Sequence, residues 1–210
     1  MEEALPGGNT HAELVRVGDT VRRPTGPWTH GEHALLVHLE RGGFEGAPRV
    51  HGIDERGREI LDYVAGEVVH PDHVDLIEPD AALAEVATVI RRFHDAATSF
   101  TAPPGAAWSE RGADPDGPKE ILCHNDLAPW NLVRTDEGRW VFIDWDLAAP
   151  GRRSWDLAWA LLGFVPLPPA VSPTGGYGGG SRSSETPTGR RSSRRTFSRS
   201  RASAADARPI

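Results

Sequence analysis

The sequence predicts an α+β fold of two lobes, followed by a disordered tail. Residues 12–64 show the pattern of strands, one helix and strands again, which is typical of a small α+β lobe. A long amphipathic helix, a hairpin and a second apolar helix then follow, up to Leu167. Beyond Leu167 the composition changes to Gly, Ser, Arg and Pro. These observations divide the chain into 1–66, an incomplete helical lobe at 67–167, and a tail at 168–210.

The first lobe is predicted from local patterns. "ELVRVGD" and "TVRRP" are two short strands joined at Gly18-Asp19. In "WTHGEHALLVHLERGGF", Leu35, Leu36 and Leu39 form one helical stripe, and Gly42-Gly43 is a stop signal. "PRVHGID", the turn "ERG" and "REILDYV" then indicate a β-hairpin.

The second lobe begins with the helix "DAALAEVATVIRRFHDAA", whose apolar residues recur at helical spacing. A loop rich in Pro and Gly, 101–118, separates this helix from a second hairpin made of "NLVR", the turn "TDEG" and "RWVFIDW". "SWDLAWALLGFV" closes the lobe as a helix, with Ser154 as its expected N-cap and Asp156 in its first turn.

Charge and composition exclude some classes of protein. The 210 residues carry a net charge of −7, which argues against a nucleic-acid binder overall. One cysteine, Cys123, allows no internal disulfide and indicates a reducing compartment. The start, "MEEALPGGNT", lacks the apolar segment of a signal peptide, and the longest apolar run is too short to cross a bilayer. We therefore expect a cytoplasmic protein without a membrane partner.

The tail has three interpretations. It holds eight Arg and two acids, a net of +6, so the first 167 residues carry −13. Such a segment buries too little apolar surface to offset its ordering entropy, which favours a solvated tail. A basic arm that binds RNA or an acidic surface is the second interpretation. The abrupt onset after an apolar helix also raises a third, a truncated or frameshifted end.

The stretch "HNDLAPWN" carries the chemistry. Asp126 and Asn131 lie in a loop that enters the second hairpin, and Asp144 lies at the far end of that hairpin. A hairpin returns the chain to its start, so the three side chains are expected to converge. A small set of oxygen ligands that leaves positions open for water and phosphate suits Mg²⁺ bound to a nucleotide.

The pattern His-x-Asp-x-x-x-x-Asn, with Asp144 eighteen residues after Asp126, resembles the catalytic segment of protein-kinase-like phosphotransferases. "HNDLAPWN" with "FIDWD" is similar to the aminoglycoside phosphotransferase family in particular. The resemblance is strong over 120–165, and "IRRFHDA" and "EILDYVAGE" add to it. It implies a kinase-like fold, ATP or GTP with Mg²⁺ as cofactors, and a small hydroxylated acceptor.

The resemblance also implies residue roles. Asp126 would orient the acceptor hydroxyl and take its proton, while Asn131 and Asp144 would hold Mg²⁺. His124 would pack the loop against the strand that bears Asp144, and Asp156 would accept backbone N–H bonds from the loop. Backbone groups of Asp62, Tyr63 and Val64 would meet the nucleotide base.

The chain departs from the kinase pattern in its first lobe. The kinase fold expects a Lys on the third strand and a Glu on the following helix, but the strand reads "TVRRP". Arg22 or Arg23 must replace the Lys, which is chemically workable because Arg binds phosphate oxygens bidentately. Glu32 is the candidate partner on the helix. Gly7-Gly8 lacks the spacing of a phosphate loop, and an ordinary turn explains it equally well.

Other conspicuous residues predict packing. His33, His38, His51 and His94 are scattered without metal-ligand spacing. Five of the seven Trp crowd around the motif, where packing against the catalytic loop is the expected role: Trp130, Trp140, Trp145, Trp155 and Trp159. Cys123 is expected to point into the core.

Three functions remain open from the sequence. The complete His-Asp-Asn-Asp set favours a kinase that phosphorylates a small-molecule hydroxyl. The family's further C-terminal helices, which build much of the acceptor pocket, are replaced here by the tail, and this favours a catalytically inactive domain. That replacement also leaves Leu157, Leu161 and Leu162 under-covered. The tail alone favours a nucleic-acid interaction.

Overall fold

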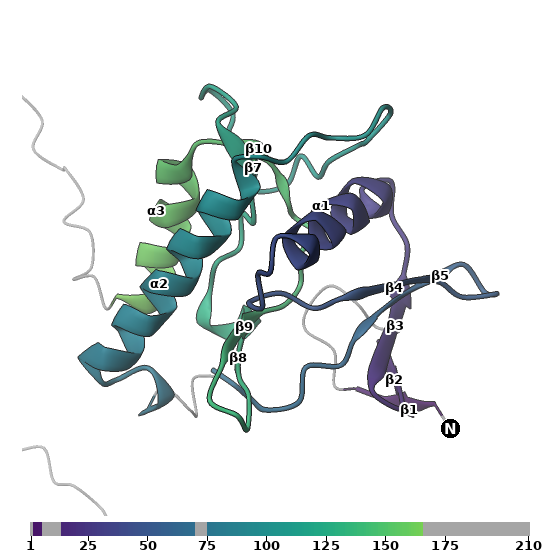
Figure 1. The fold of residues 1–210 in the computed structure, drawn as a ribbon, viewed down its shortest axis with the longest axis horizontal. Helices are drawn as coiled ribbons and strands as arrows, with labels where there is room; N and C mark the ends of the chain where they lie inside the picture. Colours follow the sequence, from purple (N-terminus) through teal and green to yellow (C-terminus); the bar gives the residue numbers. More distant parts are fainter. Residues whose placement is uncertain (1, 6–13, 70–74, 166–210) are drawn as a thin grey trace, which may run out of the picture. The chain divides into compact units, whose positions relative to one another are not determined.

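The N-terminal part of the computed structural model is a five-stranded antiparallel sheet with one helix packed against it (Figure 1). The structure describes residues 2–5, 14–69 and 75–165; Gly7-Gly8 and the predicted tail at 168–210 lie outside these ranges. The strand order is β1-β2-β3-β5-β4. The strands are β1 (Glu3–Ala4), β2 (Val15–Val17), β3 (Thr20–Pro24), β4 (Val50–Ile53) and β5 (Arg58–Asp62).

Helix α1 (Thr29–Arg41) follows the predicted stripe. Leu35 and Leu39 are completely buried, and Leu36 is 1% exposed. The helix ends where the glycine pair predicts: Gly42 is the C-cap, and Gly43 has a φ of 74°, in the left-handed region that glycine adopts without steric cost. The two predicted hairpins of this part are also present, as β2–β3 and β4–β5.

The second part contains two small sheets and two helices. Strands β8 (Leu132–Arg134) and β9 (Trp140–Phe142) form the predicted second hairpin, and β6 (Glu67–Val68) adds to it in the order β6-β8-β9. Strands β7 (Ile121–Cys123) and β10 (Ala149–Gly151) pair with each other. The short strands β1, β6, β7 and β10 were not predicted, because two or three residues show no alternation and depend on distant partners.

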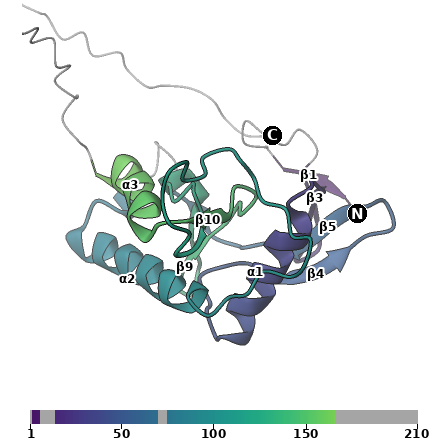
Figure 2. The same cartoon turned by 90° about the horizontal axis from the view of Figure 1, so that it is seen from above.

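Helices α2 (Asp80–Ala97) and α3 (Arg153–Phe164) lie beside these sheets (Figures 1 and 2). Val86, Ile90 and Phe93 of α2 are buried in one core, which also contains the leucines of α1 and the motif's neighbour Trp145. Cys123 is completely buried, as predicted. No helix in the described ranges is both long enough and apolar enough to span a bilayer.

One local prediction is wrong. Helix α3 begins at Arg153 with Arg152 as its N-cap, so Ser154 lies inside the helix. The chain leaves β10 in extended conformation, and Arg152 is the last residue with that conformation (φ −88°, ψ 144°). Of the five Trp expected to pack around the motif, Trp130 and Trp159 are 56% and 38% exposed. The prediction of an under-covered face on α3 is confirmed, since its leucines are 43–66% exposed: Leu157, Leu161 and Leu162.

Candidate active site

The loop 124–131 leaves β7, passes through the short 3₁₀ helix η2 (Pro129–Asn131) and enters β8. Leu127 and Ala128 are buried and anchor the middle of the loop in the core. The Asn131 amide nitrogen donates to the Asp126 carboxylate at 2.7 Å and to the Asp126 carbonyl at 3.1 Å. The structure therefore brings Asp126 and Asn131 into direct contact and fixes the rotamers of both.

His124 is completely buried beneath this loop. Its Nε2 lies 3.1 Å from the carbonyl of Ile143, and its Nδ1 accepts the backbone N–H of Asp126 at 3.3 Å. Burial lowers the pKa of His124, so the ring is neutral. With Nδ1 as acceptor, the single ring proton lies on Nε2 and is donated to Ile143. His124 thus ties the loop to the residue that precedes Asp144.

Asp156 on α3 has no exposed surface and supports the same loop from the other side. Its two carboxylate oxygens accept the backbone N–H groups of His124 at 3.2 Å and Asn125 at 2.9 Å. His94 of α2 contacts the carboxylate at 2.9 Å. Sequence reasoning grouped His94 with the scattered histidines; its place within "IRRFHDA" was the available signal.

Asp144 lies two residues after the end of β9, beside the loop. The backbone N–H of Ile143 donates to the carbonyl of Asn131 at 2.8 Å, which places the two chain segments next to each other. Among the described residues that are not glycine, Asn125 (φ 63°) and Asp144 (φ 61°) are the two with positive φ. Left-handed backbone in the two contacting segments that carry the candidate residues is an independent mark of a functional site.

Arg23 connects the first sheet to Asp144. Its Nη1 donates to Asp144 Oδ1 at 2.6 Å, its Nε donates to Glu59 Oε1 at 2.6 Å, and its Nη2 donates to Glu32 Oε1. The Arg23 side chain is 6% exposed. Burial opposes its charge, yet Glu32, Glu59 and Asp144 together raise the pKa of Arg23 above its ordinary value. The guanidinium is therefore charged and contacts three acidic side chains at once.

Glu32 supplies the helix partner that the kinase pattern requires, from the first turn of α1. It is 1% exposed, and its Oε2 has no hydrogen-bond partner. Burial raises the pKa of Glu32 to about 8, against the lowering effect of Arg23. Glu59 of β5 is a second buried acid on Arg23 that the sequence analysis did not single out.

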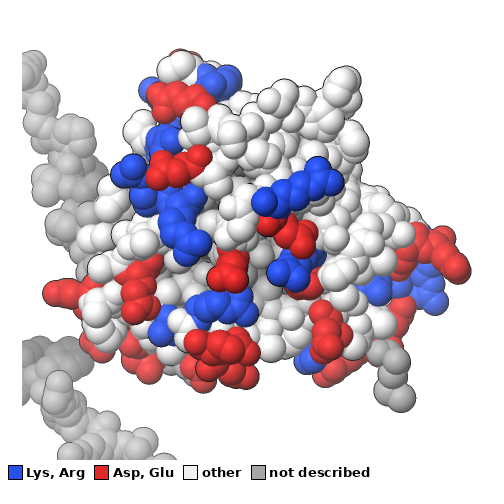
Figure 3. All heavy atoms as spheres, viewed as in Figure 1, with Lys and Arg blue, Asp and Glu red and all other residues white. Residues whose placement is uncertain are grey.

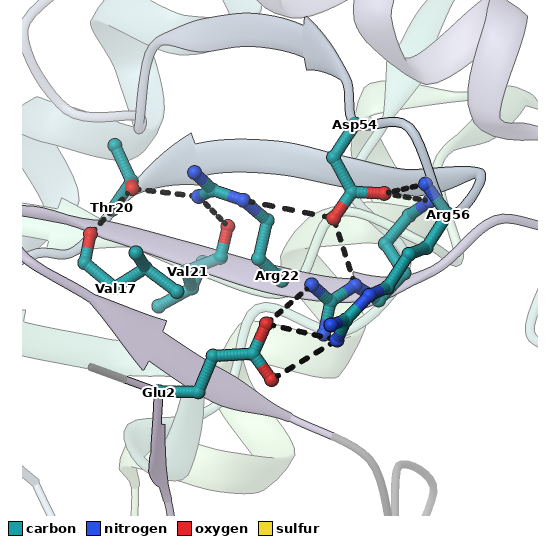
Figure 4. A network of polar contacts seen from close by, with 8 residues as sticks. Glu2, Val17, Thr20, Val21, Arg22, Asp54 and Arg56 are labelled. Atoms are coloured by element: carbon teal, nitrogen blue, oxygen red, sulfur yellow. Dashed lines mark hydrogen bonds and ion pairs between the residues drawn. The ribbon is translucent and has the colours of Figure 1, made fainter.

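Arg22 does not join this cluster. Successive residues of a strand face opposite sides of the sheet, so Arg22 points away from the partners of Arg23 and lies near Thr20 and Asp54 (Figure 4). Its Nη1 contacts the Thr20 hydroxyl at 2.6 Å, and its Nε lies 3.9 Å from Asp54. Only one of the two candidate arginines, Arg23, thus contacts the residues of the loop and hairpin.

The predicted hinge, Asp62 to Val64, lines a pocket of about 520 Å³ together with the turn of the β8–β9 hairpin. The N–H of Asp62 is bonded to the Arg49 carbonyl and the N–H of Tyr63 to the Asp19 carbonyl. These two groups are already committed, so contacts to a base must use other backbone groups of the segment. The pocket shares no residue with the Arg23 cluster.

The donor set fits a magnesium ion. Because the Asn131 amide nitrogen faces Asp126, its Oδ1 faces away from that carboxylate, and Asp144 is 32% exposed. Carboxylate and amide oxygens are the ligands that Mg²⁺ prefers, completed by water and phosphate. No group of three or more His, Cys, Asp or Glu able to hold a metal occurs in the described ranges. A magnesium ion here would therefore take part of its coordination from the nucleotide.

Comparisons with solved structures define the class of fold. The chain superposes with a TM-score of 0.52 on a choline/ethanolamine kinase family protein from Mesorhizobium loti, at 18% identity over 77% of this chain and 63% of that one. It superposes with a TM-score of 0.53 on the GDP complex of an aminoglycoside 2'-phosphotransferase-IIIa mutant, at 16% identity over 77% and 71%. The chain has a protein-kinase-like fold.

Comparisons of sequence then show what the chain resembles. Residues 105–192 match the family model described as "Phosphotransferase enzyme family". This match bears out the predicted resemblance to a phosphotransferase family over that segment. A curated relative, the trifolitoxin immunity protein of Rhizobium leguminosarum bv. trifolii, is 37% identical over 162 residues, or 76% of this chain. The chain spans 60% of the length of that relative.

Proposed function

We propose that this protein transfers the γ-phosphate of ATP or GTP to a hydroxyl group of a small molecule, with Mg²⁺. One observation carries the proposal: Arg23 contacts Asp144, and Asp144 follows the residue that is bonded to the loop of Asp126 and Asn131. Phosphoryl transfer requires alignment and charge neutralisation more than covalent chemistry from the protein. A cation, two acids and an amide in contacting segments meet that requirement.

Asp126 is the proposed base. Asn131 holds one oxygen of the carboxylate, which leaves the other to accept a hydrogen bond from the acceptor hydroxyl. As the hydroxyl oxygen bonds to the γ-phosphorus, its proton passes to Asp126, and the bond from that phosphorus to the bridging oxygen breaks. The nucleoside diphosphate leaves with the electron pair.

Asn131 and Asp144 are the proposed magnesium ligands. When bound, Mg²⁺ neutralises charge on the phosphate oxygens. Arg23 is the proposed phosphate contact, because its fork donates to oxygen pairs and its charge is maintained by three acids. The carbonyls of Asp62 to Val64 and the N–H of Val64 are proposed to meet the base.

Substitution of the proposed base and metal ligand tests the function. We expect Asp126→Asn to lower kcat by about 10²–10⁴-fold, because the proton acceptor is lost while the size is kept. Asp144→Asn is expected to lower activity at least as much and to raise the Mg²⁺ concentration for half-maximal rate. Nucleoside diphosphate and phosphorylated acceptor are measured together by chromatography across a panel of aminoglycosides, choline and sugars.

Asp116→Asn provides the control, because Asp116 is an exposed aspartate in the loop before β7. It should retain wild-type rates. Wild-type rates in both Asp126→Asn and Asp144→Asn would contradict the proposal, as would Mg²⁺-nucleotide binding without transfer to any acceptor or to water.

A second candidate function is immunity to a toxin, favoured by the 37% identity with a trifolitoxin immunity protein. We expect sensitive cells that express this chain to survive trifolitoxin. Cells that express Asp126→Asn should lose protection if phosphoryl transfer is the mechanism, and keep it if binding alone protects. Equal sensitivity with and without the wild-type chain would refute this candidate.

A further inference from the structure

The buried arginine of the candidate site has one more acid than the kinase pattern supplies. A single carboxylate from α1, Glu32, is the partner that the pattern predicts. Glu59 is an additional buried carboxylate, 1% exposed, and it lies directly opposite Arg23 in the register of β3 and β5. Burying a second negative charge is costly unless it is paired and hydrogen-bonded, so its presence calls for a role.

The geometry of the guanidinium supplies that role. Its five N–H groups lie in one plane in a fixed fork. Glu59 holds Nε at 2.6 Å, and Glu32 holds Nη2, so the plane of the group is fixed at two corners. The remaining corner, Nη1, then points to Asp144, which it contacts at 2.6 Å. With Glu32 alone, the fork could rotate about that one contact.

Glu59 is itself held in place. Its second oxygen, Oε2, contacts Nε2 of His33 at 2.9 Å. His33 follows Glu32 on α1, so the helix supplies one partner to the arginine and one partner to the acid that orients it. The contacts close a ring from α1 through β5 to β3 and back to α1. A displacement of α1 would disturb both ends of the ring together.

We propose that Glu59, held by His33, is a positioning residue that aims Arg23 at Asp144 and at the nucleotide phosphates. This inference rests on the proposed phosphotransferase function. It concerns residues that touch neither the nucleotide nor the acceptor, and it assigns them a role in nucleotide affinity rather than in the transfer step.

Substitutions of Glu59 provide the test, read as separate KM values for the nucleotide and the acceptor. We expect Glu59→Ala to raise the nucleotide KM by about 10-fold, the usual effect of losing an orienting partner, and to leave the acceptor KM unchanged. Glu59→Gln keeps a side-chain oxygen that accepts a hydrogen bond from Arg23 Nε. It should therefore raise the nucleotide KM by less, about 3-fold. Glu55→Gln, the same change at an exposed site of the same hairpin, is the matched control.

A double-mutant cycle with Arg23→Lys separates positioning from general stability. Lys has one nitrogen and no planar fork, so Glu59 cannot fix its orientation. In the Arg23→Lys background, Glu59→Gln should therefore change the nucleotide KM by less than about 2-fold. If Glu59→Ala does not fold, Glu59→Gln and the double-mutant cycle are sufficient to test the positioning role.

The outcomes distinguish this proposal from the function on which it rests. A wild-type chain that neither binds Mg²⁺-nucleotide nor transfers phosphate overturns the proposed function, and this inference with it. If the wild type is active, two results overturn the positioning role alone. One is an unchanged nucleotide KM in Glu59→Gln, and the other is an effect of Glu59→Gln that is equally large in the Arg23→Lys background.

Discussion

At the scale of single residues, neighbouring identical side chains have different roles. Arg22 and Arg23 are adjacent, and either could replace the expected lysine on sequence grounds. The pleat of β3 separates them, with Arg23 buried among acids and Arg22 on the opposite face near Asp54. The sequence could not decide between them, because the decision depends on which face of the sheet α1 covers.

Other residues of the site escaped prediction for a related reason. Glu59, His33 and His94 are isolated polar residues on a strand or a helix, where solvent exposure is the usual expectation. Their positions depend on partners 26 to 62 residues away in the chain. The motif residues were easier, because His124, Asp126 and Asn131 are close in sequence and form one loop.

Substitution of Asp156 should disturb the loop without removing a reacting group. We expect Asp156→Ala to destabilise the protein by about 3–5 kcal/mol, because it leaves two backbone N–H groups and His94 without their buried acceptor. Chemical denaturation measures this loss. Asp95→Ala, which removes an exposed carboxylate on α2, is the control and should cost less than about 1 kcal/mol. A loss below 1 kcal/mol in Asp156→Ala would contradict the bracing role.

At the scale of elements, periodic segments were predictable and short ones were not. Helices α1 and α2 and the hairpins β4–β5 and β8–β9 follow from hydrophobic spacing and turn residues within each segment. Strands β7 and β10 have three residues each and exist because residues 121–123 pair with residues 149–151. The start of α3 was misjudged, because a serine near a helix start is a preference that the preceding strand can override.

The long loop between α2 and β7 is fastened at Asp114. This residue is 1% exposed, and its carboxylate accepts two hydrogen bonds from the Arg152 side chain, at 2.6 and 2.8 Å. The Arg152 side chain, by its hydrogen bonds, holds the pKa of Asp114 well below its ordinary value of 3.8. A lowered pKa in the folded state contributes stability that is present above 3.8 and is lost as the pH falls further.

We therefore expect Asp114→Asn to be less stable than the wild type at pH 7. The difference between the two should shrink as the pH falls below about 4, because the wild-type carboxylate then approaches protonation. Urea denaturation at several pH values between 7 and 2 measures this. A difference that stays constant over that range would show that the charge of Asp114 does not fasten the loop.

At the scale of the whole molecule, the fold and the resemblance to a phosphotransferase family were predictable, and the acceptor is not. The first 167 residues carry −13, which could attract a polycationic acceptor. Figure 3 shows acidic and basic side chains interspersed on the visible face rather than gathered in one field. Charge therefore gives no choice among aminoglycosides, choline and sugars. The arrangement of the loop, the hairpin and Asp144 was predictable because a hairpin returns to its start whatever surrounds it.

The buried carboxylate of Asp156 has a consequence for how such a protein can change over generations. The segment that bears Asp126 rests on side chains from two helices, Asp156 of α3 and His94 of α2. Amino-acid replacements around His94 could shift the aim of the loop by fractions of an ångström without altering a single reacting group. Selection for a new acceptor could therefore act through residues that carry no reacting group.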